Sequence, residues 1–237
     1  MKNEPVIGVF RECTACGFRY AEAPLQTPAA DRCPRCGGYA GVAAVVRAAA
    51  TANPPPEPPR TRLAVLLDNL RSAYNVGSAF RTADGAGVEH LYLTGITPAP
   101  PHRGISKTAL GAERSVSWSH HPNSRRLVAD LQAQGWVLWA VETAPAAVPL
   151  AKMLKSPLPD RLLLALGNEI AGVDPGLLAM ADAVVALPMA GRKRSLNVAT
   201  ALAAVVYGLR LGGELRGAEE AQKGATTTPG NYSAARK

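Results

Sequence analysis

The chain has 237 residues, of which 47% are hydrophobic and 19% are charged. This composition excludes a wholly disordered protein and allows one substantial domain with a buried core and one small domain. The formal net charge of +8 points mildly to a polyanionic partner. The chain begins without the pattern of a signal peptide and has no apolar stretch long enough to span a bilayer. We therefore expect a cytoplasmic protein without a membrane partner.

All four cysteines lie near the start of the chain and form two CxxC pairs, Cys13 with Cys16 and Cys33 with Cys36. This spacing is typical of a zinc ribbon, in which two knuckles direct four thiolates at one tetrahedral ion. Two disulfides are the alternative, which a reducing compartment disfavours. Because four sulfur ligands leave no open coordination position, we expect the Zn²⁺ ion to be structural rather than catalytic.

Shifts in composition divide the chain into four segments. We assign residues 1–42 to the zinc ribbon and residues 43–60, which are rich in alanine and proline, to an extended linker. The domain boundary is therefore expected near residue 60. Residues 61–215 form the main domain, and residues 216–237 have little to bury and are expected to be disordered.

Within the main domain, apolar runs typical of strands alternate with helical patterns. Predicted strands cover 62–68, 90–95, 136–142, 161–167 and 183–188, and predicted helices cover 75–86, 124–134, 174–181 and a long segment from 195. Asn75 and Ser195 are the expected N-caps of the first and last helices. The alternation predicts an α/β domain, with a mostly parallel sheet covered by helices on both faces. Ligands are then expected at the loops after 62–68, 161–167 and 183–188.

The common nucleotide-binding and hydrolase motifs do not fit. No GxGxxG is present, and "GNEIAG" at 167–172 continues with Val173 and Asp174 where a P-loop needs lysine and a hydroxyl residue. Histidines occur at positions that match no motif, namely His90, His102, His120 and His121. We interpret His120 and His121 as part of a solvated turn.

Three segments occur in one order along the chain: "NVGSAFRTADGAGV" at 75–88, "LALGNEIAGV" at 164–173 and "ALPMAGRKRSLNVATALAAVVY" at 186–207. Together they resemble the motifs of the SPOUT-class (TrmH-like, SpoU) RNA ribose 2′-O-methyltransferases. The segment "KTALGAERSVSW" is also similar to the middle of that family, and the resemblance covers about residues 62–211.

The resemblance implies a SPOUT fold that forms a homodimer, with a C-terminal trefoil knot that builds the S-adenosylmethionine site. It implies methylation of a ribose 2′-OH in structured RNA, either tRNA or rRNA with a slight lean to tRNA, and no DNA partner. The cofactor-binding residues that it implies are Gly167, Leu187, Met189 and Leu196. The catalytic residues that it implies are Arg81, Asn75, Glu169, Ser195 and Asn197.

Individual residues allow more than one interpretation. Without the other motifs, Arg81 would be assigned to a surface ion pair with Asp84. The family match makes Arg81 the catalytic arginine, and its small neighbours Gly77 and Ser78 would leave room for a ribose and a phosphate. A guanidinium is a poor simple base, so we favour a role in gripping phosphate and stabilising the developing alkoxide, with direct base action left open.

Two other motif residues have structural alternatives. Asn197 can brace neighbouring loops as readily as it can act in catalysis. Glu169 can cap a turn or face water, whereas the family match favours a role in ordering the active-site loop. Both roles therefore stay open for Glu169 and Asn197.

Basic residues around the same loops are candidates for holding RNA, namely Arg103, Lys107, Arg114, Arg192, Lys193 and Arg194. The alternative for the 191–195 segment is a solvated loop. The ribbon departs from the accessory domains that are usual in the family, so it serves RNA binding, stability or a protein contact. The alternative to an enzyme is an RNA-binding or ribosome or RNA assembly protein that retains the SPOUT fold without catalysis.

Overall fold

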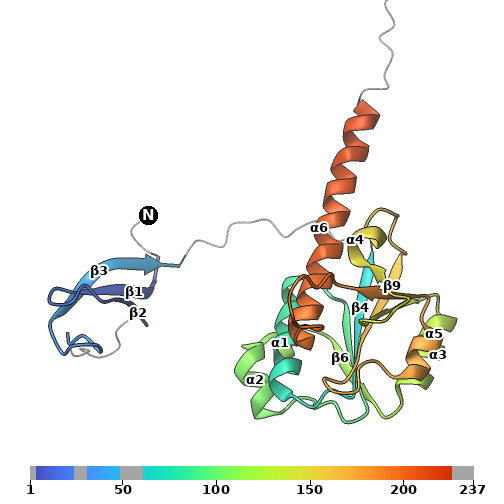
Figure 1. Ribbon diagram of the computed structural model, residues 1–237, viewed down its shortest axis with the longest axis horizontal. Helices are drawn as coiled ribbons and strands as arrows, with labels where there is room; N and C mark the ends of the chain where they lie inside the picture. The colour runs from blue at the N-terminus through green and yellow to red at the C-terminus, as the bar shows by residue number, and fades with distance from the viewer. Residues whose placement is uncertain (1–3, 24–30, 49–60, 226–237) are drawn as a thin grey trace, which may run out of the picture. The chain divides into compact units, whose positions relative to one another are not determined.

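The computed structural model describes residues 4–23, 31–48 and 61–225, with side chains described up to residue 212 (Figure 1). The chain forms two compact units, Met1–Glu57 and Pro58–Lys237. Residues 49–60 of the predicted linker lie outside the described part of the chain. Each unit is described below by itself.

The N-terminal unit contains a three-stranded antiparallel sheet in the order β2-β1-β3. Its strands are β1 (Val6–Cys13), β2 (Arg19–Glu22) and β3 (Ala40–Arg47). The predicted end of the ribbon at residue 42 lies inside β3, so residues 43–47 belong to the sheet and not to the linker. The β-branched valines at 42, 45 and 46 favour this extended conformation.

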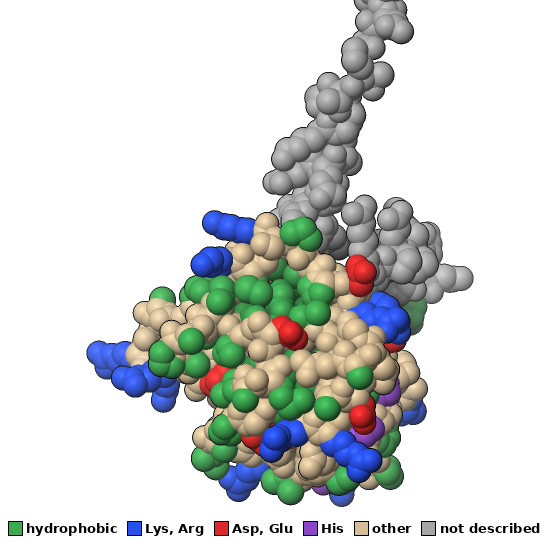
Figure 2. Space-filling model, turned by 90° about the vertical axis from the view of Figure 1, so that its right-hand side faces the viewer, with side chains coloured by type: hydrophobic (Ala, Val, Ile, Leu, Met, Phe, Trp, Pro, Cys, Tyr) green, Lys and Arg blue, Asp and Glu red, His purple; other side chains and the backbone are tan. Residues whose placement is uncertain are grey.

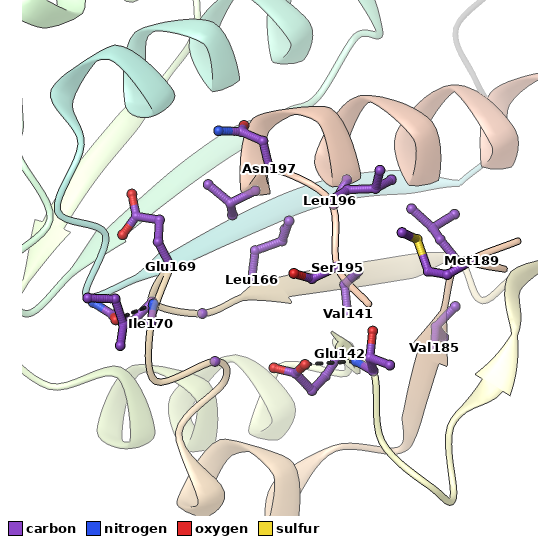
Figure 3. A pocket seen from close by; sticks show the side chains of 17 residues that line it. Val141, Glu142, Leu166, Glu169, Ile170, Val185, Met189, Ser195, Leu196 and Asn197 are labelled. Atoms are coloured by element: carbon purple, nitrogen blue, oxygen red, sulfur yellow. Dashed lines mark hydrogen bonds between the residues drawn. The ribbon is translucent and has the colours of Figure 1, made fainter. Parts of the chain in front are cut away.

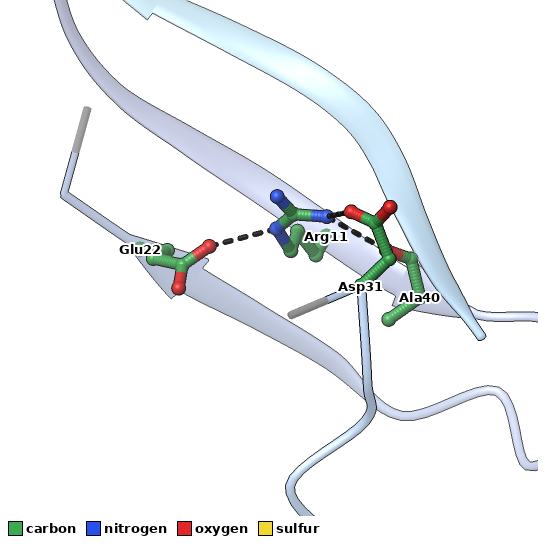
Figure 4. A network of polar contacts seen from close by, with 4 residues as sticks. All are labelled: Arg11, Glu22, Asp31 and Ala40. Atoms are coloured by element: carbon green, nitrogen blue, oxygen red, sulfur yellow. Dashed lines mark hydrogen bonds and ion pairs between the residues drawn. The ribbon is translucent and has the colours of Figure 1, made fainter. Parts of the chain in front are cut away.

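A buried arginine supplies much of the interior of this small unit. Only 2% of Arg11 is exposed, and its Nε donates to Glu22 at 2.7 Å (Figure 4). Its Nη1 donates to Asp31 at 2.9 Å and to the carbonyl of Ala40 at 2.8 Å. The hydrogen bonds that Arg11 donates to Glu22 and then to Asp31 raise the pKa of Arg11, so it stays charged. The network ties β1 to the chain on both sides of residues 24–30.

The second unit is built on a seven-stranded sheet in the order β6-β5-β4-β9-β7-β10-β8, in which every neighbouring pair is parallel. All five predicted strands are present. The strands are β4 (Arg62–Asp68), β5 (His90–Thr94), β6 (Trp118–His121), β7 (Val137–Val141), β8 (Val148–Pro149), β9 (Arg161–Leu166) and β10 (Ala183–Ala186). The edge strand β8 has only two residues, and the edge strand β6 ("WSHH") has no apolar run, so neither stands out in the sequence.

Helices cover both faces of this sheet (Figure 1). One face packs against α1 (Ala73–Gly85) and α6 (Val198–Ala225) in a core that includes Phe80, Leu164 and Val206. The other face packs against α3 (Ser124–Ala133) and α5 (Pro175–Met180). Shorter elements complete the unit, namely α2 (Arg103–Ala109), the 3-10 turn η1 (Ala112–Arg114) and α4 (Leu150–Met153). The predicted α/β arrangement with helices on both faces is confirmed.

Both predicted N-caps are wrong by a few residues. Helix α1 begins at Ala73, and its cap is Ser72, whose hydroxyl accepts from the backbone N–H of Asn75 at 3.3 Å. Helix α6 begins at Val198, and Asn197 accepts from the N–H of Ala199 at 2.9 Å. Asn75 therefore lies inside the first turn of its helix, where its side chain is free to reach another element.

Two further expectations are corrected. His120 and His121 belong to strand β6 rather than to a solvated turn, and the hydroxyl of Ser119 lies 2.8 Å from Nε2 of His121. Residues 216–225 of the segment expected to be disordered continue α6 and include three alanines and two glutamates, which are good helix formers, whereas residues 226–237 lie outside the described part of the chain. The C-terminal knot stays a prediction. No helix in the described ranges has the length and apolar character needed to cross a bilayer.

Candidate active site

A cavity of about 290 Å³ lies at the carboxyl ends of β7, β9 and β10, against the start of α6 (Figure 3). All four predicted cofactor residues line it: Gly167, Leu187, Met189 and Leu196. The predicted catalytic residues Glu169, Ser195 and Asn197 line it as well. Apolar side chains of Val141, Leu166 and Val185 complete the walls. The strand order thus brings two separate motifs to one pocket, as expected for a parallel sheet.

The loop after β9 closes on itself at the edge of this pocket. Asn168 and Gly172 exchange two backbone hydrogen bonds of 2.9 Å. A Cβ at Gly167 would collide with the carbonyl group of Gly172, so the loop can close only with glycine at 167. The side-chain oxygen of Asn168 accepts from the N–H groups of Ile170 and Ala171 at 2.9 and 3.0 Å. Glycine is therefore required at position 167 by the backbone of the loop itself, before any contact with a cofactor is considered.

Glu169 projects from this loop toward the N-terminus of α1. Its carboxylate accepts from the backbone N–H groups of Arg71 at 2.9 Å and Ser72 at 3.1 Å, and from Nδ2 of Asn75 at 3.0 Å. Desolvation raises the pKa of Glu169, but hydrogen bonds led by the one from Arg71 outweigh it, and the pKa lies below its usual value. The carboxylate therefore ties the loop after β4 to the loop after β9, which fits the predicted ordering role.

Asn75 links this carboxylate to the third motif. Because its Nδ2 donates to Glu169, its Oδ1 is available as an acceptor, and Nδ2 of Asn197 donates to it at 3.1 Å. The Oδ1 of Asn197 is in turn occupied by the N–H of Ala199. A chain of hydrogen bonds thus runs from Glu169 through Asn75 to Asn197. This arrangement supports the loop-bracing interpretation of Asn197.

Sequence reasoning missed Glu142, which follows β7 and lines the same pocket. Its carboxylate accepts from the N–H of Thr143 at 2.7 Å and from the N–H of Val173 at 3.0 Å. A Cβ at Gly172, whose φ is +74°, would press on this carboxylate. Glu142 is the last residue of the predicted strand at 136–142, and a carboxylate at the carboxyl end of a parallel strand is the signal in the sequence that points to this site.

Arg81 lies in a second, open groove of about 670 Å³, formed by α1, α2 and α6. The groove is lined by Ser78, Arg81, Thr82, Asp84, Gly85, Lys107, Thr108, Leu110 and Tyr207. Arg81 is exposed, and within the described residues it forms no ion pair. Asp84 instead accepts from the hydroxyl of Ser115 at 2.7 Å. The surface ion pair between Arg81 and Asp84 is therefore absent from the described part of the chain.

The small residue Gly77 has a different purpose from the one expected. It is buried, and a Cβ there would collide with the carbonyl of Ile105 and with the hydroxyl of Thr108. Gly77 therefore lets α1 pack closely on α2 and does not itself line the groove beside Arg81. Ser78 does line the groove of Arg81.

The predicted RNA-binding residues lie on two regions of the surface. Arg103 and Lys107 are exposed on α2, and Arg114 on η1 lies 3.6 Å from Glu113. The segment with Arg192, Lys193 and Arg194 is exposed between β10 and α6, next to the pocket. Figure 2 shows Lys and Arg side chains spread around one face, with no single continuous patch.

The four cysteines of the N-terminal unit are free thiols whose sulfur atoms all lie within 4.8 Å of one another, which excludes the two-disulfide alternative in this structure. Cys13 and Cys36 are 3.5 Å apart, and Cys16 and Cys33 are 3.7 Å apart. Tetrahedral Zn²⁺ with Zn–S bonds of about 2.3 Å requires sulfur separations of about 3.8 Å.

The thiol pKa values also fit a shared cation. The N–H of Cys16 is the largest influence that lowers the pKa of Cys13 to about 7. The N–H of Gly38 favours the thiolate of Cys36, but the neighbouring sulfurs of Cys16 and Cys13 raise the pKa of Cys36 to about 12. Zn²⁺ binds the deprotonated form of cysteine, so a bound ion would hold all four as thiolates, and the donor set fits Zn²⁺.

The sequence model of the SpoU rRNA Methylase family matches residues 62–207. A 23S rRNA (guanosine-2′-O-)-methyltransferase of Vibrio parahaemolyticus is 33% identical over 141 residues, which cover 60% of this chain and 56% of that protein. A tRNA (guanosine(18)-2′-O)-methyltransferase of Escherichia coli is 30% identical over 145 residues, 61% of each chain. The chain thus spans little more than half the length of these curated relatives.

Solved structures agree with this match. An AdoMet-bound rRNA methyltransferase from Sinorhizobium meliloti superposes with a TM-score of 0.58 at 28% identity, over 63% of this chain and 56% of that one. A putative RNA methyltransferase of the TrmH family from Porphyromonas gingivalis gives a TM-score of 0.57 at 28% identity, over 65% of this chain and 61% of that one. The second unit has the SPOUT methyltransferase fold, and the chain belongs to the SpoU rRNA methylase family.

Proposed function

We propose that this protein transfers a methyl group from S-adenosylmethionine to a ribose 2′-OH of structured RNA, tRNA or rRNA, with a slight lean to tRNA. The observation that carries the proposal is the chain of hydrogen bonds from Glu169 through Asn75 to Asn197. It joins all three sequence motifs at the rim of one pocket. The named relatives act on guanosine 2′-hydroxyls of 23S rRNA and of tRNA, which supports this reaction class.

The pocket suits the proposed cofactor. Its apolar walls can enclose an adenine ring, and backbone groups of the loop after β9 lie at its edge. The carboxylates of Glu142 and Glu169 line the same pocket and favour a cationic ligand. S-adenosylmethionine, when bound, supplies a methyl group on a cationic sulfur. The residues that would hold it are Gly167, Leu187, Met189 and Leu196.

Arg81 is proposed to act on the RNA. Its guanidinium is exposed and free of acidic partners in the described part of the chain, so both edges can face a phosphate. A guanidinium binds phosphate through two parallel hydrogen bonds, and this grip would hold the adjoining ribose in place. The 2′-oxygen would attack the methyl carbon of S-adenosylmethionine with S-adenosylhomocysteine as the leaving group, and the proton of the 2′-OH would pass to the adjoining phosphate. The positive charge of Arg81 would stabilise the developing oxyanion.

The separation of the two sites supports a homodimer. Arg81 lines the groove of α1, α2 and α6, whereas the cofactor residues line the pocket at the strand ends. Leu110 and Tyr207 in the groove are 67% and 43% exposed. We infer that a second copy covers these side chains and brings the Arg81 of one chain to the pocket of the other. We also propose that the ribbon holds a structural Zn²⁺ ion and that the enzyme works in the cytoplasm on its RNA.

The test uses the full-length chain, S-adenosylmethionine with a tritiated methyl group, and two RNA pools, total tRNA and ribosomal RNA, from cells that lack the protein. Incorporation into one pool supports the proposal and identifies the RNA class. RNA binding without any incorporation, in a protein that binds S-adenosylmethionine in calorimetry, would instead support an assembly protein that retains the fold.

A further inference from the structure

One face of the ribbon sheet has a composition that its zinc-binding role does not explain. Phe10 and Glu12 alternate on β1 with the buried Val9, Arg11 and Cys13, so they point away from the small core. Arg19 of β2 lies directly opposite Glu12 in the antiparallel register. Directly opposed residues share a face of the sheet, which places Phe10, Glu12 and Arg19 on one surface.

Tyr39 and Arg32 extend this surface. Gly41 lies opposite Glu12 in the register of β1 and β3, so the missing side chain of Gly41 would point to the same face. A Cβ at Gly41 would meet Cε1 of the Tyr39 ring at 3.4 Å, which shows that the ring lies over the backbone of Gly41. Arg32 forms an isolated antiparallel bridge with Tyr39. We define the aromatic face as Phe10, Glu12, Arg19, Arg32 and Tyr39.

The side chains of the aromatic face are available to a partner. Tyr39 is 59% exposed and Phe10 is 38% exposed. The tyrosine ring lies against the position that a Gly41 side chain would take, and more than half of Tyr39 is open to solvent. The guanidinium of Arg19 lies 5.8 Å from the centre of the Phe10 ring, a cation–π arrangement. Both rings are therefore accessible to a ligand.

The charge on this face is positive after internal pairing. Glu12 is its one acid, and it is paired with Arg19 at 2.7 Å. The other acids nearby, Glu22 and Asp31, both pair with the buried Arg11, whose single positive charge offsets one of their two negative charges. Arg32 forms no ion pair within residues 4–23, 31–48 and 61–225. The face thus combines open aromatic rings with a free guanidinium and no free carboxylate.

We propose that the aromatic face binds unpaired nucleotides of RNA, with a base stacked on Tyr39 and a phosphate held by Arg32. Bases in single strands stack on exposed aromatic rings of β-sheets, while arginines hold the backbone. The proposal rests on the proposed function in one respect, namely that the nucleic acid bound by this face is RNA. It deepens that function, because it gives the ribbon a part in choosing RNA with an accessible single-stranded segment.

The test is fluorescence anisotropy of the full-length protein with a labelled, unstructured oligoribonucleotide of about 12 nucleotides at fixed salt. Tyr39→Ala is expected to weaken binding about tenfold, because it removes a stacking surface. Tyr39→Phe keeps the ring and should bind within about twofold of wild type. Arg32→Gln should weaken binding and lower the dependence on salt by about one phosphate contact.

The matched control is Val45→Ala. Val45 is 50% exposed and pairs with Val9, so it lies on the opposite face of the same sheet, and its loss should leave RNA affinity unchanged. A duplex of the same length should bind Tyr39→Ala and wild type alike. Zinc content and melting temperature of each variant report whether the ribbon stays folded.

Unchanged affinity in a zinc-loaded Tyr39→Ala variant would overturn the proposal, as would an equal loss in Val45→Ala. Either result would favour a protein, rather than RNA, as the partner of the aromatic face. Methyl incorporation and cofactor binding are measured separately. A failure of the proposed function would therefore appear as missing methyl transfer in the wild type, whatever the anisotropy shows.

Discussion

The side-chain amide of Asn197, at the start of α6, donates a hydrogen bond of 3.1 Å to the side-chain oxygen of Asn75, in the first turn of α1. Asn75 then donates to Glu169 on the loop after β9. Three segments that are far apart in the sequence are therefore linked to one another through these side chains. Because each amide uses both its donor and its acceptor, a substitution at Asn75 breaks two contacts at once.

This relationship predicts a loss of function that exceeds the loss of stability. Asn75→Asp places a second carboxylate against Glu169 and should lower methyl transfer at least tenfold by repulsion. A double-mutant cycle of Asn75→Ala and Asn197→Ala should give a coupling energy of about 0.5–3 kcal/mol in transition-state stabilisation. The measurement is kcat/KM for methyl transfer, together with the melting temperature.

Asn123→Ala is the matched control for these variants. Asn123 caps α3, where it accepts from the N–H of Arg126 at 3.0 Å, and it does not line the pocket. Its loss should cost about 1 kcal/mol of folding free energy and leave methyl transfer per folded molecule unchanged. Equal effects of Asn123→Ala and Asn75→Ala on kcat/KM would show that the amide chain has only a structural role.

The carboxylate of Glu169 predicts a pH dependence of cofactor binding. Its pKa is lowered in the folded state by hydrogen bonds, so its stabilising contribution is present above the unfolded pKa of about 4.3 and is lost as the pH falls through the lower folded pKa. Protonation of Glu169 would release the loop that lines the pocket, so affinity for S-adenosylmethionine should not depend on Glu169 between pH 7 and pH 5 and should decline as the pH falls below about 4.3. Glu169→Gln should remove that decline, and a decline centred near pH 6 that this variant abolishes would contradict the assignment.

Gly77 and Gly85 provide a paired test of helix packing on α1. A Cβ at Gly77 meets backbone and side-chain atoms of α2, so Gly77→Ala should lower the free energy of unfolding by about 1–3 kcal/mol. A Cβ at Gly85 meets only the hydroxyl of Tyr207, the end of a flexible side chain. Gly85→Ala should therefore be close to neutral in urea unfolding. If both variants unfold alike, the close approach of α1 to α2 is not what requires glycine at 77.

The central strands could be predicted because β4 and β9 are buried on both faces and are continuous runs of aliphatic residues. The edge strand β6 could not, because its "WSHH" sequence has no apolar run. The first residues of helices were predicted wrongly where several possible N-cap residues lie close together in the sequence. Ser72 and Asn75 are both good caps, and only the tertiary contact of Asn75 with Glu169 decides between them.

The pocket residues could be named from the motifs, but their geometry could not. Nothing in the sequence shows that a side chain at position 167 would collide with the carbonyl group of Gly172, or that a side chain at position 77 would collide with α2. The atoms that require glycine at position 77 belong to a helix distant in the sequence, and those that require glycine at position 167 lie across a turn. The carboxylate of Glu142 was missed because no motif contains it, although it ends a predicted strand.

The ribbon should contain one zinc ion per chain. Metal analysis of freshly purified protein checks the stoichiometry, and Cys36→Ser should lower zinc content and destabilise the N-terminal unit, because a hydroxyl is a poor substitute for a thiolate ligand. Mass spectrometry under non-reducing conditions provides the control. Absence of zinc, or two disulfides in protein kept reduced, would contradict the metal site.

Arg81 is expected to matter for chemistry and not for folding. It is exposed and has no ion-pair partner in the described ranges, so Arg81→Ala should leave the melting temperature and cofactor affinity nearly unchanged. Methyl transfer should fall on the order of a hundredfold or more. Arg81→Lys should restore little, because an ammonium group lacks the two-pronged donor geometry. An unfolded Arg81→Ala protein whose folded fraction remains fully active would show that the arginine is structural.

The position of the transferred methyl group tests the central claim most directly. RNA methylated by the full-length protein with labelled S-adenosylmethionine is hydrolysed in alkali, which cleaves every linkage that has a free 2′-OH. Methylation of a ribose 2′-oxygen predicts that the label is recovered in alkali-resistant dinucleotides, and that Arg81→Ala loses this signal. Label recovered in mononucleotides as a methylated base, or no label in either RNA pool, would contradict the account.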